Sequence, residues 1–267
     1  MKTSPHVLVG FVCLLGGLLS AWAQEGLPEA RVLPDPSSPP GGGQSGSVTL
    51  AMVSSKVNQI TDEDAWWERN GLEKPAIYLR FPAVAQGAIP DGAPKSYQGK
   101  PLMAVWSGSR RRFFVYGEQI YKARYLLAEA EGGGSIEYAF DAKSYGTAAW
   151  ADIVDGILYL SNTPGNLSAE GGRGARIFAI DLESNSIRWA SPENTCHGQF
   201  LVIAGSVVCG YGFTAEPDFI YVLDRFDGSA IQAVKLETAA DWLIQKEDLL
   251  YVRCYNRDEV YRIEIRD

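Results

Sequence analysis

The sequence is poor in the residues that build most catalytic and metal sites. It has two histidines among its 267 residues, His6 and His197, and four cysteines, none of which is adjacent to another. A structural or catalytic zinc ion needs three or four histidine, cysteine or carboxylate ligands, several of them at short spacing. One histidine and three scattered cysteines beyond residue 23 therefore argue against a metal site.

Other catalytic signals are also missing. His197 would need a nucleophile and an orienting carboxylate to act as a base. Its neighbour Cys196 does not qualify, since adjacent residues of a strand point to opposite faces. The glycine runs 132–134 and 171–174 open no helix and so do not read as nucleotide sites. We expect no catalytic residue and no cofactor. The one route left open is a pair of carboxylates, as in glycoside hydrolases, for which Asp152 is the candidate.

The chain also lacks a net positive charge and a long apolar run. Its net charge of −8 argues against nucleic acid and against an anionic membrane surface as partners. The apolar segment Val7–Leu19 is too short to span a bilayer. It follows Lys2 and precedes Ala21-Trp22-Ala23, a small-x-small cleavage site. We expect residues 1–23 to be a signal peptide and the mature protein to be exported, periplasmic or secreted, soluble, and to begin at Gln24.

The N-terminal part of the mature chain divides into two regions. Residues 24–46 are rich in proline and glycine, so we expect a disordered tether. Residues 47–267 form the expected folded domain, with an irregular part at 47–100. That part contains a strand at Ser47–Val53 and a short helix at Thr61–Asn70, with acidic residues in its first turn and Gly71 as its stop.

From residue 101 onward a pattern of short strands repeats. In each copy an apolar strand ends in an acidic residue; the copies are Ala123–Glu129, Ala175–Asp181, Phe219–Asp224 and the truncated Glu259–Glu264. A repeat of about 40–45 residues made of short strands is typical of a propeller blade. We therefore predict an all-β, β-propeller-like fold with about four to five four-stranded blades. The acid that ends each strand is expected to accept hydrogen bonds from the amides of the following turn.

The last repeat ends without its outer strand. A closed propeller does not leave such an edge bare. The strand Ser47–Val53 could supply the missing edge and join the two ends of the ring. An open, incomplete or oligomer-completed assembly is the alternative.

The copy at Ala175–Asp181 is followed by Ser184, Asn185 and Trp189. It resembles the repeat of pyrroloquinoline-quinone-type β-propellers, in which an aromatic-Ala-apolar-Asp strand precedes a Thr-Gly turn and a tryptophan. The quinone enzymes of that family are much longer and have two adjacent cysteines. The resemblance thus implies the fold without the cofactor. It makes exported, non-enzymatic members, such as the propeller scaffold of outer-membrane protein assembly, the closer analogy. We expect Trp189 and Tyr221 to pack between blades.

Two clusters are candidate binding residues. Trp66 and Trp67 lie on the predicted helix and would anchor a partner if one were exposed, with core packing as the alternative. Arg110, Arg111 and Arg112 form a basic run at a hairpin tip, with a solvated turn as the alternative. We predict a non-catalytic binding or scaffold protein with a protein partner. The alternative is a carbohydrate-binding protein or glycoside hydrolase, which the tryptophans and tyrosines suggest.

Three cysteines lie beyond residue 23, so at most one internal disulfide can form. A turn at Gly205-Ser206 would pair Cys209 with Val202 and leave Cys196 about 20 Å away unless the chain bends back. Cys209 and Cys254 are therefore the better pair. Small buried free thiols are common, however, and we favour them over a bridge.

Overall fold

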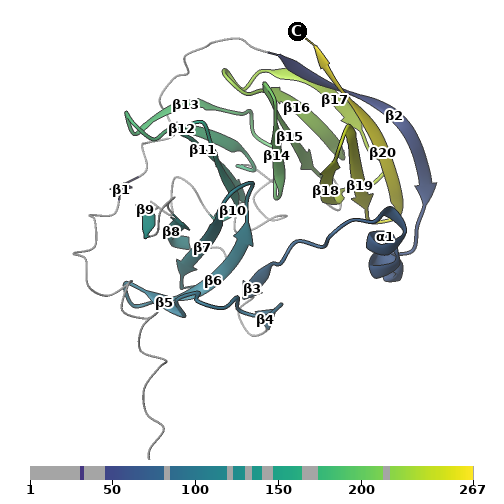
Figure 1. Cartoon of the computed structure of the whole chain (residues 1–267). Coiled ribbons are helices and arrows are strands. Elements are labelled where there is room, and N and C mark those ends of the chain that lie inside the picture. Colours follow the sequence, from purple (N-terminus) through teal and green to yellow (C-terminus); the bar gives the residue numbers. More distant parts are fainter. Residues whose placement is uncertain are drawn as a thin grey trace, which may run out of the picture.

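The computed structural model describes residues 31–32, 46–80, 85–118, 123–129, 134–139, 147–163, 174–212 and 217–266. The predicted signal peptide at 1–23 and most of the tether at 24–46 lie outside these residues. Among the described residues, the chain is built from strands with one α-helix, and no helix is long and apolar enough to cross a bilayer. Figure 1 shows the strands arranged as successive sheets in an arc.

The propeller-like architecture that the repeat predicted is present as four successive antiparallel units. The first comprises β6 (Lys100–Ser107), β7 (Arg112–Gly117), β8 (Ala123–Glu129) and β9 (Ser135–Ala139). The second comprises β10 (Thr147–Val154), β11 (Ile157–Thr163), β12 (Ile177–Asp181) and β13 (Ser186–Ala190). The third comprises β14 (Phe200–Ile203), β15 (Ser206–Tyr211), β16 (Phe219–Asp224) and β17 (Ala230–Lys235). The fourth comprises β18 (Ala240–Lys246), β19 (Leu249–Cys254), β20 (Arg257–Arg266) and β2 (Ser47–Val57).

Short strands from the N-terminal part extend the first sheet. They are β3 (Tyr78–Arg80), β4 (Ala85–Gln86) and β5 (Ser96–Tyr97) on the β6 side, and β1 (Arg31–Val32) on the β9 side. β1 pairs in parallel with β9. Two residues of the segment that we expected to be a tether therefore belong to a sheet edge.

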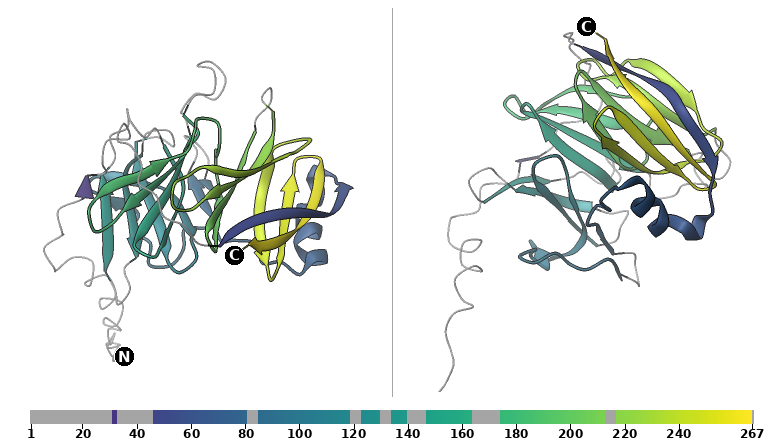
Figure 2. Two further views of the ribbon diagram at one scale, coloured as in Figure 1. Left: turned by 90° about the horizontal axis from the view of Figure 1, so that it is seen from above. Right: turned by 45° about the vertical axis from the view of Figure 1, so that its right-hand side comes forward.

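The N-terminal strand completes the fourth sheet, as predicted. β2 runs antiparallel to β20 from Ser47, opposite Arg266, to Val57, opposite Arg257, and both views in Figure 2 show the two strands side by side. The strand is longer than the expected Ser47–Val53. It also bonds to the third sheet, because Val48 N donates to Ser206 Oγ at 2.9 Å.

Successive sheets pack against one another around the arc, with β8 against β10, β10 against β14, and β14 against β18. Among the described residues, no strand of the fourth sheet packs to a comparable extent on a strand of the first. The chain between α1 and β3 crosses this side of the molecule (Figure 1). β2 thus completes the last sheet, but the four sheets form an open arc. This is the incomplete assembly that the sequence analysis gave as the alternative to a closed ring.

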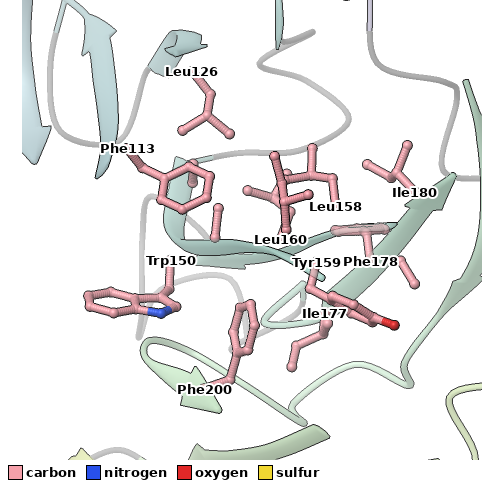
Figure 3. Close-up of a cluster of buried hydrophobic side chains, with 14 of the residues drawn as sticks. Phe113, Leu126, Trp150, Leu158, Tyr159, Leu160, Ile177, Phe178, Ile180 and Phe200 are labelled. Atoms are coloured by element: carbon pink, nitrogen blue, oxygen red, sulfur yellow. The ribbon is translucent and has the colours of Figure 1, made fainter. Parts of the chain in front are cut away.

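The core lies between the sheets. Figure 3 shows side chains from the first three sheets in one cluster, among them Phe113, Trp150, Phe178 and Phe200. Trp106 of the first sheet stacks on Trp150 of the second with ring centroids 5.3 Å apart. Its indole nitrogen also donates to Ala151 O at 3.1 Å. Aromatic packing of this kind fixes the offset between neighbouring sheets.

Trp189 joins the second sheet to the third, as expected of the repeat. It is fully buried, and its indole nitrogen donates to Arg225 O at 2.8 Å in the turn between β16 and β17. The ring covers Gly228 so closely that a Cβ there would lie 2.5 Å from Trp189 Cε3. Tyr221 is half-buried and packs against the same cluster.

The acids at the ends of the third strands have the predicted role in two repeats. Asp181 Oδ1 accepts from the amides of Glu183 at 3.0 Å and Ser184 at 2.9 Å. Asp224 Oδ1 accepts from Phe226 N at 2.7 Å and Asp227 N at 3.2 Å. In the first repeat the equivalent Glu129 binds an arginine instead, as described below.

Candidate functional site

Trp66 and Trp67 belong to the core and do not form a surface anchor. They lie on α1 (Glu63–Asn70), which follows a 3-10 turn, η1 (Ile60–Asp62), and ends at Gly71 in the left-handed conformation. Only 1% of Trp66 and 5% of Trp67 is exposed. Trp67 meets Trp242 of β18 edge to face, with ring centroids 5.3 Å apart. The helix therefore uses both rings to dock on the fourth sheet.

A buried arginine holds the start of this helix. Arg253 of β19 is 3% exposed in its side chain and binds Asp62 at 2.9 Å and Asp258 at 3.0 Å. Its guanidinium also lies 5.8 Å from the centroid of Trp66. A Thr-Asp-Glu-Asp start is typical of a capped helix, but Asp62 makes no capping bond to the helix amides. The long-range ion pair with Arg253 takes the place of the cap.

The arginine run lies at the turn between β6 and β7, as predicted. Gly108 N donates to Arg111 O at 2.9 Å and closes the turn. Arg112 pairs with Glu129 at 2.5 Å, and Arg111 Nη1 donates to Glu129 O at 3.3 Å. Arg110 is exposed and makes no ion pair within the described ranges. The three arginines therefore differ: Arg112 is engaged, whereas Arg110 faces solvent.

Asp152, the candidate carboxylate for hydrolysis, holds this turn in place. It lies on β10 of the second sheet, is 6% exposed, and accepts bonds from Ser109 N, at 3.1 and 3.2 Å, and from Ser109 Oγ. Ile153 N donates to it as well, at 2.8 Å. A Cβ on Gly108 would lie 2.6 Å from Asp152 Oδ1, so the turn needs glycine there. Asp152 thus positions the turn from the neighbouring sheet.

The turn borders a cavity of about 360 Å³ between the first three sheets. Its wall is formed by eight residues: Ser109, Arg110, Arg111, Ile153, Val154, Asp155, Gly156 and Val202. These residues come from the β6–β7 turn, from the β10–β11 turn with the end of β10, and from β14. The cavity combines a basic rim with an apolar wall and contains no aromatic ring among its lining residues.

A second ion pair fixes the other side of the cavity. Asp155 binds Arg225 of the third sheet, which also donates to Ala204 O at 3.1 Å and to Tyr159 Oη at 3.1 Å. Because Arg225 pairs with Asp155, the cation at the rim that makes no ion pair within the described ranges is Arg110. In the sequence, the Asp155-Gly156 pair between two apolar runs indicates a hairpin turn. Its contact with the arginine turn depends on packing between repeats, which the repeat spacing alone does not give.

His197 lies half-buried in the connection between β13 and β14. Burial lowers the pKa of its imidazole, its backbone amide donates to Gly210 O at 3.3 Å, and its ring meets Tyr211 edge to face. It lines a small cavity of about 120 Å³ near Asp241. Among the described residues, no group of three or more histidine, cysteine or acidic side chains is arranged to hold a metal ion. Cys196, Cys209 and Cys254 are buried free thiols, the outcome that the sequence favoured over a Cys209–Cys254 bridge.

No protein-family model and no curated protein matches the sequence. Solved structures that resemble the fold include a europium-containing methanol dehydrogenase, with 11% identity and a TM-score of 0.33 over 54% of this chain and 26% of that one. The chain thus spans about a quarter of the dehydrogenase. BamB from Moraxella catarrhalis matches with 11% identity and a TM-score of 0.28, over 80% of this chain and 98% of that one. At these scores the architecture rests on the strand pairing described above.

Proposed function

We propose that the protein is a non-catalytic binding scaffold that docks an acidic, partly apolar segment of a protein partner in the cavity beside Arg110. The observation that carries this proposal is the basic rim above an apolar wall at one end of the sheets. Arg110 makes no ion pair with any residue that the structure describes, so its charge is available to a ligand, whereas Arg112 is paired with Glu129. Arginine beside a desolvated apolar surface is a common anchor in protein interfaces.

The chemistry of the cavity favours an anionic peptide over a sugar. Ile153 is buried and Val154 and Val202 are half-buried, so they provide an apolar wall for an aliphatic side chain. Sugar sites in proteins present aromatic rings, and the residues lining this cavity include none. A carboxylate at the rim would meet guanidinium groups, which bind carboxylates with paired hydrogen bonds.

The rim is held rigidly, which lowers the cost of binding. Asp152 fixes the amide and hydroxyl of Ser109, and Arg225 fixes Asp155. Both contacts cross between sheets, so neither turn can move away from the neighbouring sheet without breaking its hydrogen bonds. In a preorganised site, less of the binding free energy is lost to the ordering of loops. The same contacts engage both oxygens of Asp152, which argues against its use as a catalytic acid.

The test is a peptide selection. A displayed library of acidic and apolar peptides is panned on the wild-type chain, and the selected peptide is measured by fluorescence anisotropy. Arg110→Glu should weaken binding by about 30-fold or more, which corresponds to an anchor of about 2 kcal/mol. Arg262→Glu is the matched control, since Arg262 is 59% exposed on β20 with only a 3.6 Å contact to Asp248. Its effect should be less than about threefold.

Two outcomes would contradict the proposal. One is a selection with no acidic preference, or with equal loss in both variants. The other is turnover of a glycoside substrate that disappears in Asp152→Asn, since this would make the cavity a catalytic site.

A further inference from the structure

The connection between β13 and β14 folds back onto β15. Thr195 N donates to Ala175 O at 3.0 Å, and His197 N donates to Gly210 O at 3.3 Å. Cys209 Sγ lies 3.5 Å from Thr195 O. Cys196 is therefore flanked on both sides by contacts to Cys209 and Gly210. The separation of about 20 Å expected from the strand register is wrong, because that estimate assumed a straight continuation of β14.

The fold-back brings two cysteines together. The Cys196 thiol donates to Gly198 O at 3.4 Å and the Cys209 thiol donates to Thr195 O at 3.5 Å. Both residues are 0% exposed, and the Cys196 thiol is near enough to contribute to the raised pKa of Cys209. A disulfide needs Cα atoms within about 4.4–6.8 Å, which is the spacing of neighbouring hydrogen-bonded backbones. Cys254 lies apart from them, on β19, and packs in a different hydrophobic cluster. Among the described residues there is thus one pair of neighbouring thiols and one isolated thiol.

We propose that Cys196 and Cys209 form an intramolecular disulfide when the chain folds in the presence of a small disulfide such as oxidised glutathione. The thiolate of one cysteine attacks glutathione disulfide and releases one glutathione thiolate. The second cysteine thiolate then attacks the protein sulfur of the mixed disulfide and releases the other. Both cysteine sulfurs are oxidised, both glutathione sulfurs are reduced, and the two thiol protons pass to the released glutathiones.

The timing of the reaction follows from burial. Desolvation raises the pKa of Cys209 well above the usual range of a thiol, so the folded protein offers little thiolate to an oxidant. Since neither side chain reaches solvent, the exchange must occur before the β13–β14 connection closes over β15. The bond would then tie the connection that leaves the second sheet to β15 of the third.

The experiment uses the full chain with Cys13→Ser, which leaves three cysteines. The protein is unfolded, refolded with reduced and oxidised glutathione, and alkylated in denaturant. Peptide mapping without reduction should show Cys196 linked to Cys209 and only Cys254 alkylated. The oxidised protein should melt about 5–10 °C above the reduced one, as expected for a short closed loop in a chain of this size.

Matched variants decide the result. Cys254→Ser should retain the link and the gain in melting temperature, and Cys209→Ser should lose both. Three alkylated cysteines after oxidative refolding would overturn the proposal. A link that includes Cys254 would overturn it as well.

Discussion

The contact between Trp189 and Gly228 offers a direct test of how the sheets are joined. Replacing Trp189 by alanine removes a fully buried indole and its bond to Arg225 O. Loss of a buried tryptophan costs about 3–5 kcal/mol through lost apolar contacts and the cavity left behind. The orphaned carbonyl adds about 1 kcal/mol. A loss of this size is a large fraction of the usual stability of a domain, which is about 5–15 kcal/mol.

The opposite change, Gly228→Ala, overfills the same contact. Gly228 has a φ of +74°, so alanine there costs about 1 kcal/mol in backbone strain. The new Cβ would lie 2.5 Å from Trp189 Cε3, which adds about 1–3 kcal/mol of overpacking. Gly156→Ala is the matched control, because Gly156 has a φ of +75° and no atom within 4 Å of the added Cβ. It should cost the strain alone.

The two sites should therefore be coupled. In a Trp189→Ala background, Gly228→Ala should cost no more than Gly156→Ala, because the ring that blocks the Cβ is gone. Urea denaturation of the single and double variants measures each difference. If Trp189→Ala costs less than about 1 kcal/mol, and Gly228→Ala equals Gly156→Ala in the wild-type background, the indole does not seat on the β16–β17 turn. The reasoning from the repeat would then be refuted.

Two further predictions concern the N-terminal strand and acid stability. Removing residues 24–53 should lower the denaturation midpoint strongly, because it takes away Val48 and Leu50 from the core, whereas removing 24–45 should have little effect; equal midpoints would contradict the role of β2. The Ser184 amide and the Arg188 guanidinium lower the pKa of Asp181 to about 2. Its charged form therefore stabilises the fold above about pH 4, by at most about 2 kcal/mol, and this is lost as the pH falls toward 2. Asp181→Asn should be less stable than wild type at pH 6 and nearly equal at pH 2, as measured by urea denaturation, and a gap that does not narrow would contradict the assignment.

The sequence predicts the repeat architecture well because its signals are local. The acid at the end of each third strand marks the following turn. A tryptophan on the next strand marks the inter-sheet contact, and Trp189 makes that contact. The pairing of β2 with β20 also follows from the sequence, since the fourth repeat lacks an outer strand and a bare edge is unfavourable.

The errors concern contacts that no local pattern encodes. Trp66 and Trp67 stand on a short helix whose partners, Trp242 and Arg253, come from the far end of the chain. The strand register predicts a long separation between Cys196 and Cys209 only if the chain continues straight from β14. The amides of Thr195 and Cys196 instead donate to Ala175 O, and the chain turns back. In each case a tertiary contact decides the position.

The candidate site was likewise predictable in its local turns but not in its contacts between sheets. The sequence identified the arginine turn and the Asp155-Gly156 turn separately, but the cavity exists because each turn is held by the next sheet. Asp152 of the second sheet fixes Ser109 of the first, and Arg225 of the third sheet fixes Asp155 of the second. These bonds act between neighbouring sheets in sequence order. The cavity therefore depends on pairwise contacts along the arc and not on closure of the ring, which explains how an open arc of four sheets can hold the cavity proposed to bind a partner.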